Sequence, residues 1–193
     1  TEDDDNLDAP VTEWSVQPAP RFTEARNGLA WYPAECDVSI RPGWFYHASQ
    51  DTKVKSLGHL LDIYYKSVGR NAGLLLNVPP DRRGRFHEAD VTRLRELRHA
   101  LDQTFDRDLA ISMTATADAA PDCPAAHVTD KDDGTYWMPP EGTAPVRLGL
   151  TARAAVTFDR ILLAEYIPRG QRVEAFHVDA FADGAWETVA SGT

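Results

Sequence analysis

The chain has 193 residues, enough for one sizeable domain or two small ones, and a formal net charge of -10. Its 20 Lys and Arg against 30 Asp and Glu argue against a nucleic-acid or anionic-membrane surface, because both need clustered cations. No apolar run approaches the length of a membrane span, and no signal peptide is visible. Cys36 and Cys123 could form one bridge, but they lack metal-ligand spacing, so we expect free thiols, no metal and no cofactor.

Residues 1–30 show little periodicity and are punctuated by Pro, Asn and Gly, which predicts a long surface loop. Residues 31–47 then combine two carboxylates, one guanidinium, one imidazole and five aromatic rings. Within them, Val38 and Ile40 alternate with polar residues, as in a short strand, and Pro42 and Gly43 predict a turn. Rings beside charged groups suit a sugar site, because rings stack on a sugar and charged groups bind hydroxyls or move protons. The alternative is a strand and turn with buried rings.

A helix is predicted next, because apolar residues recur at spacings of three and four: Val54, Leu57, Leu61, Tyr64 and Val68. Asp51 or Thr52 can cap its start, and Gly69 and Asn71 end it. The short apolar run at residues 72–78 is typical of a parallel strand buried on both faces. Asn77, near the end of this strand, could bind a ligand, orient another side chain or fix the next turn.

Residues 79–84 predict a turn, and a second helix follows with one apolar stripe: Val91, Leu94, Leu97, Leu101 and Phe105. The charged residues between these positions are interpreted as a solvated face. The order strand, helix, strand, helix with short links predicts an α/β fold with parallel strands. Two such units cannot close a sheet, so they suggest the last fraction of a larger wound structure.

The composition changes near residue 111, and we place a domain boundary between residues 108 and 113. Strand-like runs are predicted at residues 146–150, 154–166 and 172–182, with an irregularity at His177. Asp183 and Gly184 predict a hairpin turn into a returning strand at residues 186–189. The pattern therefore predicts an antiparallel, all-β fold for the second half of the chain. The start at Thr1 and the end after a strand suggest a piece of a longer protein.

Three segments in this order resemble the C-terminal part of an α-L-fucosidase catalytic domain, glycoside hydrolase family 29: residues 31–47, residues 64–71 and residues 74–84. The sequence of residues 33–47 resembles the branch of this family that prefers α-1,3 and α-1,4 fucosyl linkages. Residues 111–193 resemble a discoidin-like, or coagulation factor type C, β-sandwich. The resemblance implies an α/β plus all-β fold class. Residues 1–110 would supply the last strand–helix units of a (β/α)8-like barrel, and residues 111–193 part of an incomplete antiparallel β-sandwich.

Family 29 enzymes are retaining hydrolases, which need two carboxyl groups about 5 to 5.5 Å apart. By resemblance, Glu35 matches the acid/base of this branch, with Asp37 as the runner-up or as its partner. If the backbone is extended here, Asp37, two residues on, shares a strand face with Glu35. A wall formed by Trp31 and Trp44 could raise the pKa of Glu35 so that it holds its proton near neutral pH.

Substrate contacts are expected from the same stretch. Trp44 is the candidate ring under the fucose, with core packing as the alternative. Arg41, His47, Trp31 and Asp37 complete the expected substrate-binding set, with Arg41 and His47 as candidates for hydroxyl contacts.

The family's nucleophile is an aspartate on an earlier strand that this sequence does not contain. The resemblance therefore implies a parent that cleaves fucosylated oligosaccharides or glycoconjugates in the periplasm or outside the cell, and a fragment that is inactive alone. One alternative is a carbohydrate-binding module that uses Tyr136 and Trp137. Another is a structural fragment without activity. Acidic residues at 130, 132 and 133 could ligate calcium, but we favour a solvated turn.

Overall fold

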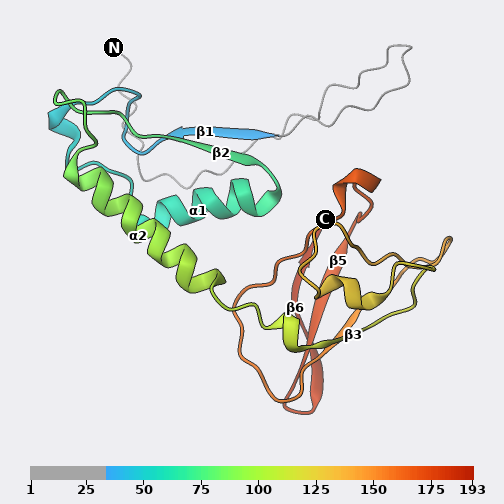
Figure 1. The fold of residues 1–193 in the computed structure, drawn as a ribbon. Helices are drawn as coiled ribbons and strands as arrows, with labels where there is room; N and C mark the ends of the chain where they lie inside the picture. Colours follow the sequence, from blue (N-terminus) through green and yellow to red (C-terminus); the bar gives the residue numbers. More distant parts are fainter. Residues whose placement is uncertain (1–33) are drawn as a thin grey trace, which may run out of the picture. The chain divides into compact units, whose positions relative to one another are not determined.

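The computed structural model describes residues 34–193, which belong to two compact units, residues 1–105 and residues 106–193 (Figure 1). The first unit ends three residues before the predicted boundary region. Its elements are β1 (Glu35–Ser39), a 3-10 turn (Ala48–Gln50), α1 (Leu57–Ser67), a 3-10 turn (Val68–Arg70), β2 (Gly73–Asn77) and α2 (Glu88–Phe105). Among the residues that the structure describes, no helix is long and apolar enough to cross a membrane.

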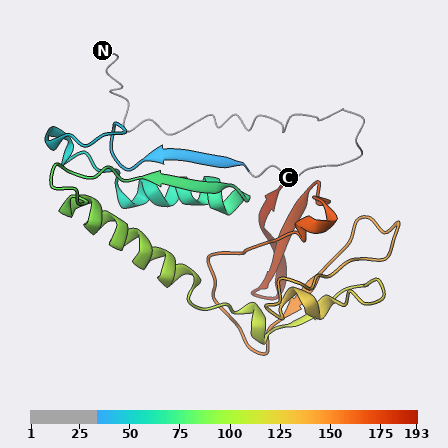
Figure 2. The same cartoon turned by 45° about the horizontal axis from the view of Figure 1, so that its top comes forward.

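Strands β1 and β2 pair in parallel, which confirms the predicted strand–helix–strand order of the first unit. In Figures 1 and 2, α1 lies alongside the pair. Val38, Leu74 and Leu76 pack against a core of Ile40, Leu60 and Ile63. Leu75, however, is 53% exposed on the other face. The prediction that residues 72–78 are buried on both faces is therefore wrong for the described residues, because this core covers only one face of the strand pair.

Helix α1 begins at a different residue from the one that the sequence suggested. Ser56 is its N-cap, and the Ser56 hydroxyl accepts a hydrogen bond from the His59 amide at 3.2 Å. The residues predicted as caps, Asp51 and Thr52, precede the helix by several residues. The predicted end holds, because Asn71 adopts a left-handed conformation with φ of 63° after the 3-10 turn.

Helix α2 starts at Glu88, after the predicted turn, and its apolar stripe contributes Leu94 and Leu97 to the core. Phe105, predicted on the same stripe, is 46% exposed and lies 6.4 Å from the Tyr64 ring. In the first turn of α2, Asp90 is completely buried. A buried carboxylate needs a cationic partner. We therefore expect the partner of Asp90 to attach the start of α2 to the rest of the unit.

The second unit contains two antiparallel pairs: β3 (Thr114–Thr116) with β4 (Gly149–Thr151), and β5 (Phe176–Ala182) with β6 (Ala185–Gly192). The hairpin predicted at Asp183 and Gly184 is confirmed, and both residues have positive φ, 51° and 84°. The register shifts between Val178 and Asp179, beside the predicted irregularity at His177. The strand predicted over residues 154–166 is wrong, since the structure has no strand there. The sandwich itself stays a prediction.

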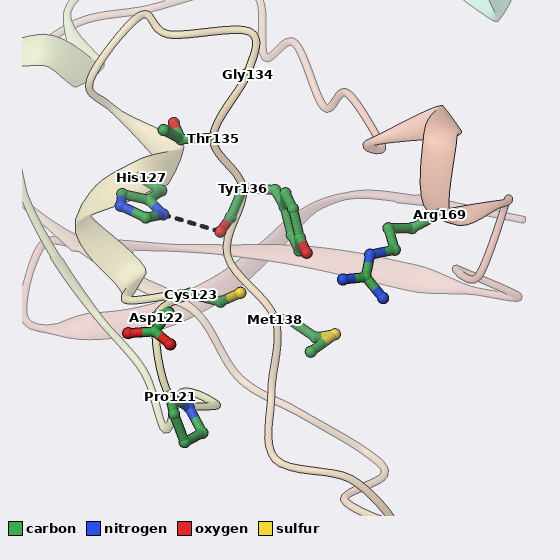
Figure 3. Close-up of a pocket in the computed structure, with 9 residues that line it drawn as sticks. All are labelled: Pro121, Asp122, Cys123, His127, Gly134, Thr135, Tyr136, Met138 and Arg169. Atoms are coloured by element: carbon green, nitrogen blue, oxygen red, sulfur yellow. Dashed lines mark hydrogen bonds between the residues drawn. The ribbon is translucent and has the colours of Figure 1, made fainter.

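A cavity of about 350 Å³ lies in the second unit, beside the 3-10 turns Ala125–Val128 and Ile167–Arg169 (Figure 3). Tyr136 lines it and stacks on Tyr166 with ring centroids 4.4 Å apart. The guanidinium of Arg169 lies 5.7 Å from the Tyr136 ring centroid. Trp137 instead donates its indole N–H to the Asp118 carbonyl at 3.0 Å, so it holds two loops together.

Candidate active site

The exposed face of β1 carries the two candidate carboxylates. Glu35 and Asp37 are exposed, whereas the intervening Cys36 and the following Val38 are half-buried. This alternation places both carboxylates on one face of the strand, as the sequence predicted. Burial, together with the negative charge of Asp37, raises the pKa of the Cys36 thiol, and this cysteine is free. Nothing in this exposed setting withdraws the two carboxylates from solvent within the described residues.

The loop that follows β1 presents aromatic surface. Trp44 is 51% exposed and Phe45 is 78% exposed, and His47 is exposed as well. Glu35 is the first residue of β1, and the loop follows Ser39, its last residue. At ~3.3 Å per residue, the backbone of Glu35 therefore lies about 13 Å from the start of the loop. The structure therefore brings Glu35 and Asp37 together, and separately exposes Trp44. Trp31, the other predicted ring, lies outside the described residues.

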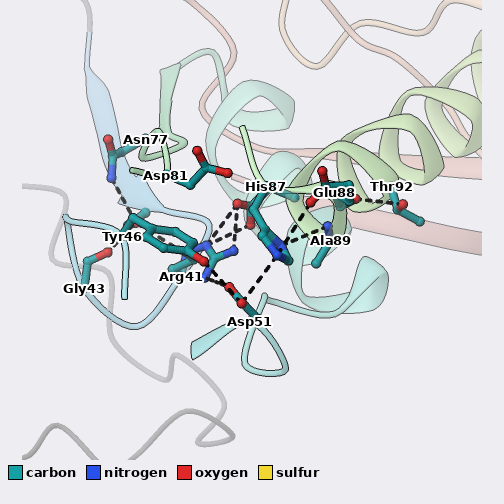
Figure 4. A network of polar contacts seen from close by, with 12 residues as sticks. Arg41, Gly43, Tyr46, Asp51, Asn77, Asp81, His87, Glu88, Ala89 and Thr92 are labelled. Carbon is teal, nitrogen blue, oxygen red and sulfur yellow. Dashed lines mark hydrogen bonds and ion pairs between the residues drawn. The ribbon is translucent and has the colours of Figure 1, made fainter. Parts of the chain in front are cut away.

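Arg41, predicted to contact substrate hydroxyls, has no exposed surface and lies in the core of the first unit (Figure 4). Its Nε donates to both carboxylate oxygens of Asp90 at 3.0 Å, and its Nη2 lies 2.9 Å from Asp90 Oδ2. Its Nη1 donates to Asp51 Oδ1 at 3.0 Å. A guanidinium enclosed in this way has no free face for a substrate, so Arg41 ties the loop to α2.

Asp51 connects this ion pair to two aromatic rings. The Tyr46 hydroxyl donates to Asp51 Oδ2 at 3.2 Å, and His87 Nε2 lies 3.4 Å from the same oxygen. The Tyr46 ring also lies 4.8 Å from the Arg41 guanidinium carbon. Burial, then the charge of Asp51 and their hydrogen bond, raise the pKa of Tyr46, so it remains a protonated donor. This network ties the start and the middle of the segment between β1 and α1 to each other.

Neither Asp90 nor His87 was predicted to have a role. Asp90 precedes Leu94 by four residues and Leu97 by seven, which places an acid on the apolar stripe of α2. An acid at such a position is a sequence sign of a buried ion pair. Its partner Arg41 lies 49 residues earlier, and no local pattern identifies it.

Asn77 closes the same end of the strand pair. Its Nδ2 donates to Ser39 Oγ at 3.0 Å and to the Trp44 carbonyl at 3.1 Å. The Ser39 hydroxyl in turn donates to the Gly43 carbonyl at 2.8 Å. The contact with Ser39 Oγ agrees with one of the three expected roles, the orientation of another side chain. The contact with the Trp44 carbonyl was not expected, because it holds an earlier loop and not the turn at residues 79–84.

The acidic residues considered for calcium form a turn. Asp130 accepts from the Asp132 amide at 2.9 Å and from the Thr135 hydroxyl at 2.7 Å, and Asp132 accepts from the Gly134 amide at 2.8 Å. Across residues 34–193, no group of His, Cys, Asp and Glu side chains is arranged to hold a metal ion.

The first unit thus combines a parallel strand pair, an exposed carboxylate face and an anchored tryptophan loop in one α/β segment. Comparison with known families gives a more specific result. Residues 21–103 match the family model "Alpha-L-fucosidase". Residues 21–103 of this chain are therefore similar to the α-L-fucosidase family, glycoside hydrolase family 29.

Individual relatives agree with this family. A protein from Oryza sativa subsp. japonica is 40% identical over 172 residues, which are 86% of this chain and 33% of the relative. Alpha-L-fucosidase 1 of Arabidopsis thaliana is 38% identical over 183 residues, 90% of this chain and 36% of its own length. The chain thus spans about a third of the length of these curated relatives.

Two solved structures have a similar fold. SpGH29 matches with a TM-score of 0.73 and 39% identity, over 82% of this chain and 35% of its own. A Ruminococcus gnavus GH29 fucosidase in complex with fucose matches with a TM-score of 0.71 and 27% identity, over 86% of this chain and 34% of its own. The likeness therefore extends beyond the segment matched by the family.

Proposed function

We propose that this chain is part of a retaining α-L-fucosidase that releases terminal L-fucose in α-1,3 or α-1,4 linkage from oligosaccharides or glycoconjugates. The names of the matched family and of the Arabidopsis thaliana relative support this function. The observation that carries it is the exposure of Glu35 and Asp37 on one face of β1. In this proposal, residues 1–110 belong to a (β/α)8-like barrel and residues 111–193 to a discoidin-like sandwich.

Glu35 is proposed as the acid/base, with Asp37 as its neighbour and the alternative acid. As an acid, Glu35 would protonate the glycosidic oxygen; as a carboxylate, it would then activate the water that releases the sugar. Trp44 would supply the ring beneath the fucose, supported by its exposure of 51%. His47 and Trp31 remain proposed substrate contacts. Arg41 is reassigned from substrate contact to positioning, because its guanidinium is enclosed by Asp90 and Asp51.

We further propose that residues 1–193 alone do not hydrolyse fucosides. A retaining site needs a nucleophilic carboxylate in addition to the acid. Among residues 34–105, the more buried carboxylates are Asp51, Asp81 and Asp90, and each is paired with an arginine. Tests of activity therefore use the full-length protein.

The direct test of substrate and mechanism follows fucose release from trisaccharides by proton NMR. The full-length protein should release fucose from α-1,3- and α-1,4-linked substrates faster than from an α-1,2-linked one. The first product should be the α-anomer, because retention preserves the configuration of the bond. First appearance of the β-anomer contradicts retention, and a preference for the α-1,2 linkage contradicts the proposed branch.

A second candidate function is glycan binding by the second unit, favoured by the cavity that Tyr136 lines. Of the two neighbouring rings, Tyr136 lines this cavity, whereas Trp137 bonds to the Asp118 carbonyl. Tyr136→Ala therefore tests sugar binding, and Trp137→Ala tests support of the loops. If the cavity binds sugar, Tyr136→Ala should abolish binding of the full-length protein to immobilised fucosylated glycans. Glycan binding that is unchanged in both variants contradicts this candidate.

A further inference from the structure

The carboxyl ends of β1 and β2 meet at Ser39 and Asn77, which are paired in register. Beyond this point the chain leaves β1 as the loop that carries Trp44. Asn77 Nδ2 reaches both Ser39 Oγ, at 3.0 Å, and the Trp44 carbonyl, at 3.1 Å. Ser39 Oγ donates to the carbonyl of Gly43, at 2.8 Å. Two side chains therefore hold the backbone at two consecutive residues of the loop.

The loop depends on these side chains because other backbone restraints are few. Among the described residues, no backbone–backbone hydrogen bond involves residues 42–46, whereas the Ile40 amide donates to the Asn77 carbonyl at 2.9 Å. Ser39 is only 7% exposed, so its hydroxyl is already fixed within the unit. Removal of the Asn77 donor would leave the Trp44 carbonyl without its described partner.

We infer that Asn77 is a positioning residue: through Ser39 and through the Trp44 carbonyl, it fixes the conformation of the loop that carries Trp44. This inference rests on the proposed function, which places Trp44 beneath the sugar. A stacking ring contributes binding energy only when its face is held parallel to the sugar, so an ordered loop lowers the entropy lost on binding. Asn77 thus acts on substrate binding through Trp44, without touching the substrate.

The first experiment measures loop order directly in the full-length protein. Asn77→Asp keeps the shape of the side chain but removes both donated hydrogen bonds. Chymotrypsin cleavage after Trp44 or Phe45, mapped by mass spectrometry, should accelerate by roughly threefold to tenfold, as the loss of one or two hydrogen bonds allows. Ser67→Ala is the matched control, because it removes a buried hydroxyl bonded to the Ile63 carbonyl of α1. The control should leave cleavage at the Trp44 loop unchanged.

The second experiment tests whether Asn77 acts through Trp44. Trp44→Ala and Asn77→Asp should each raise KM for a fucoside, with a smaller change in kcat. In the double variant, Asn77→Asp should add little to the KM of Trp44→Ala, because the ring that it positions is absent. Ser67→Ala should leave KM at the wild-type value.

The outcomes separate this inference from the proposed function. If Trp44→Ala raises KM while Asn77→Asp changes neither loop cleavage nor KM, the positioning role is overturned and the proposed function stands. Additive effects in the double variant also overturn the positioning role. If Trp44→Ala leaves KM unchanged, the substrate contact of Trp44 fails, and the inference fails with it.

Discussion

The ion pair of Arg41 with Asp90 connects two segments that are far apart in the sequence, and both side chains are fully buried. Substitution of either residue is expected to be destabilising, since water does not reach the two charges and each is stabilised mainly by the other. A buried pair contributes modestly when complete, but loss of one partner leaves an uncompensated charge. Arg41 and Asp90 therefore control whether the loop between β1 and α1 stays attached to α2.

We predict that Asp90→Ala lowers the free energy of unfolding of the first unit by about 3 to 5 kcal/mol, because Arg41 would remain buried without its main partner. The double variant Asp90→Leu with Arg41→Met should lose less, since it removes both charges. Chemical denaturation of the full-length protein, followed by a probe in the first unit, measures both. A double variant less stable than Asp90→Ala contradicts this account.

Asp81 provides a pH-dependent test at the same scale. Hydrogen bonds from the Arg83 guanidinium, at 2.6 and 2.9 Å, lower the pKa of Asp81 from 3.8 to about 2. The pKa is depressed in the folded state, so the stabilising effect is complete above the unfolded pKa and is lost as pH falls toward about 2. The protein should therefore lose this contribution between about pH 4 and pH 2.

The measurement compares thermal unfolding of wild type and Asp81→Asn over this acidic range. Wild type should be more stable near neutral pH, and the difference should shrink as the pH falls. Asp62→Asn is the control, because the Asp62–Lys66 pair is exposed and contributes little. A difference for Asp81→Asn that is independent of pH contradicts the assigned pKa.

At the level of elements, the start of α1 shows how local hydrogen bonding decides a boundary. Ser56→Ala should lower the free energy of unfolding by about 1 kcal/mol, because the His59 amide loses its acceptor. Thr52→Ala, at a residue that the sequence suggested as the cap, should have almost no effect. Thermal unfolding of both variants checks this. Equal losses in the two variants would show that the cap is misassigned.

The sequence predicted those elements that depend on neighbouring residues. Parallel pairing of β1 with β2 followed from the strand–helix–strand order, and the hairpin turn followed from Asp183 and Gly184, whose backbone needs positive φ. The exposure of Leu75 was missed, because an apolar run does not say which of its faces is covered. The cap at Ser56 was missed because Asp51 has equal capping chemistry but is bonded to Arg41.

The candidate site was predictable in residue type but not in arrangement. The strand alternation correctly placed Glu35 and Asp37 on one face. Arg41 was expected among the substrate contacts, and the structure buries it instead, since its partner Asp90 comes from a distant helix. The contact of Asn77 with the Trp44 carbonyl likewise joins residues 33 positions apart, which sequence spacing does not encode.

For the molecule as a whole, the proposed catalytic strand β1 and the anchored aromatic loop belong to the first unit, and the second unit contains antiparallel pairs. The first unit supplies Glu35 and Trp44, and the second supplies the cavity around Tyr136. The chain covers about a third of its curated relatives, so catalysis is a property to be tested in the full-length protein. Glu35 is the residue on which the proposed mechanism depends most.

The most direct test compares full-length wild type with Glu35→Ala on two fucosides, one with a good leaving group and one with a poor leaving group. A general acid matters most when the departing oxygen needs a proton, and such catalysis contributes roughly 10² to 10⁴ in rate. We predict a severe loss of kcat/KM for the poor leaving group and a much smaller loss for the good one. Equal losses on both substrates would contradict the assignment of Glu35 as the acid and would transfer that role to Asp37.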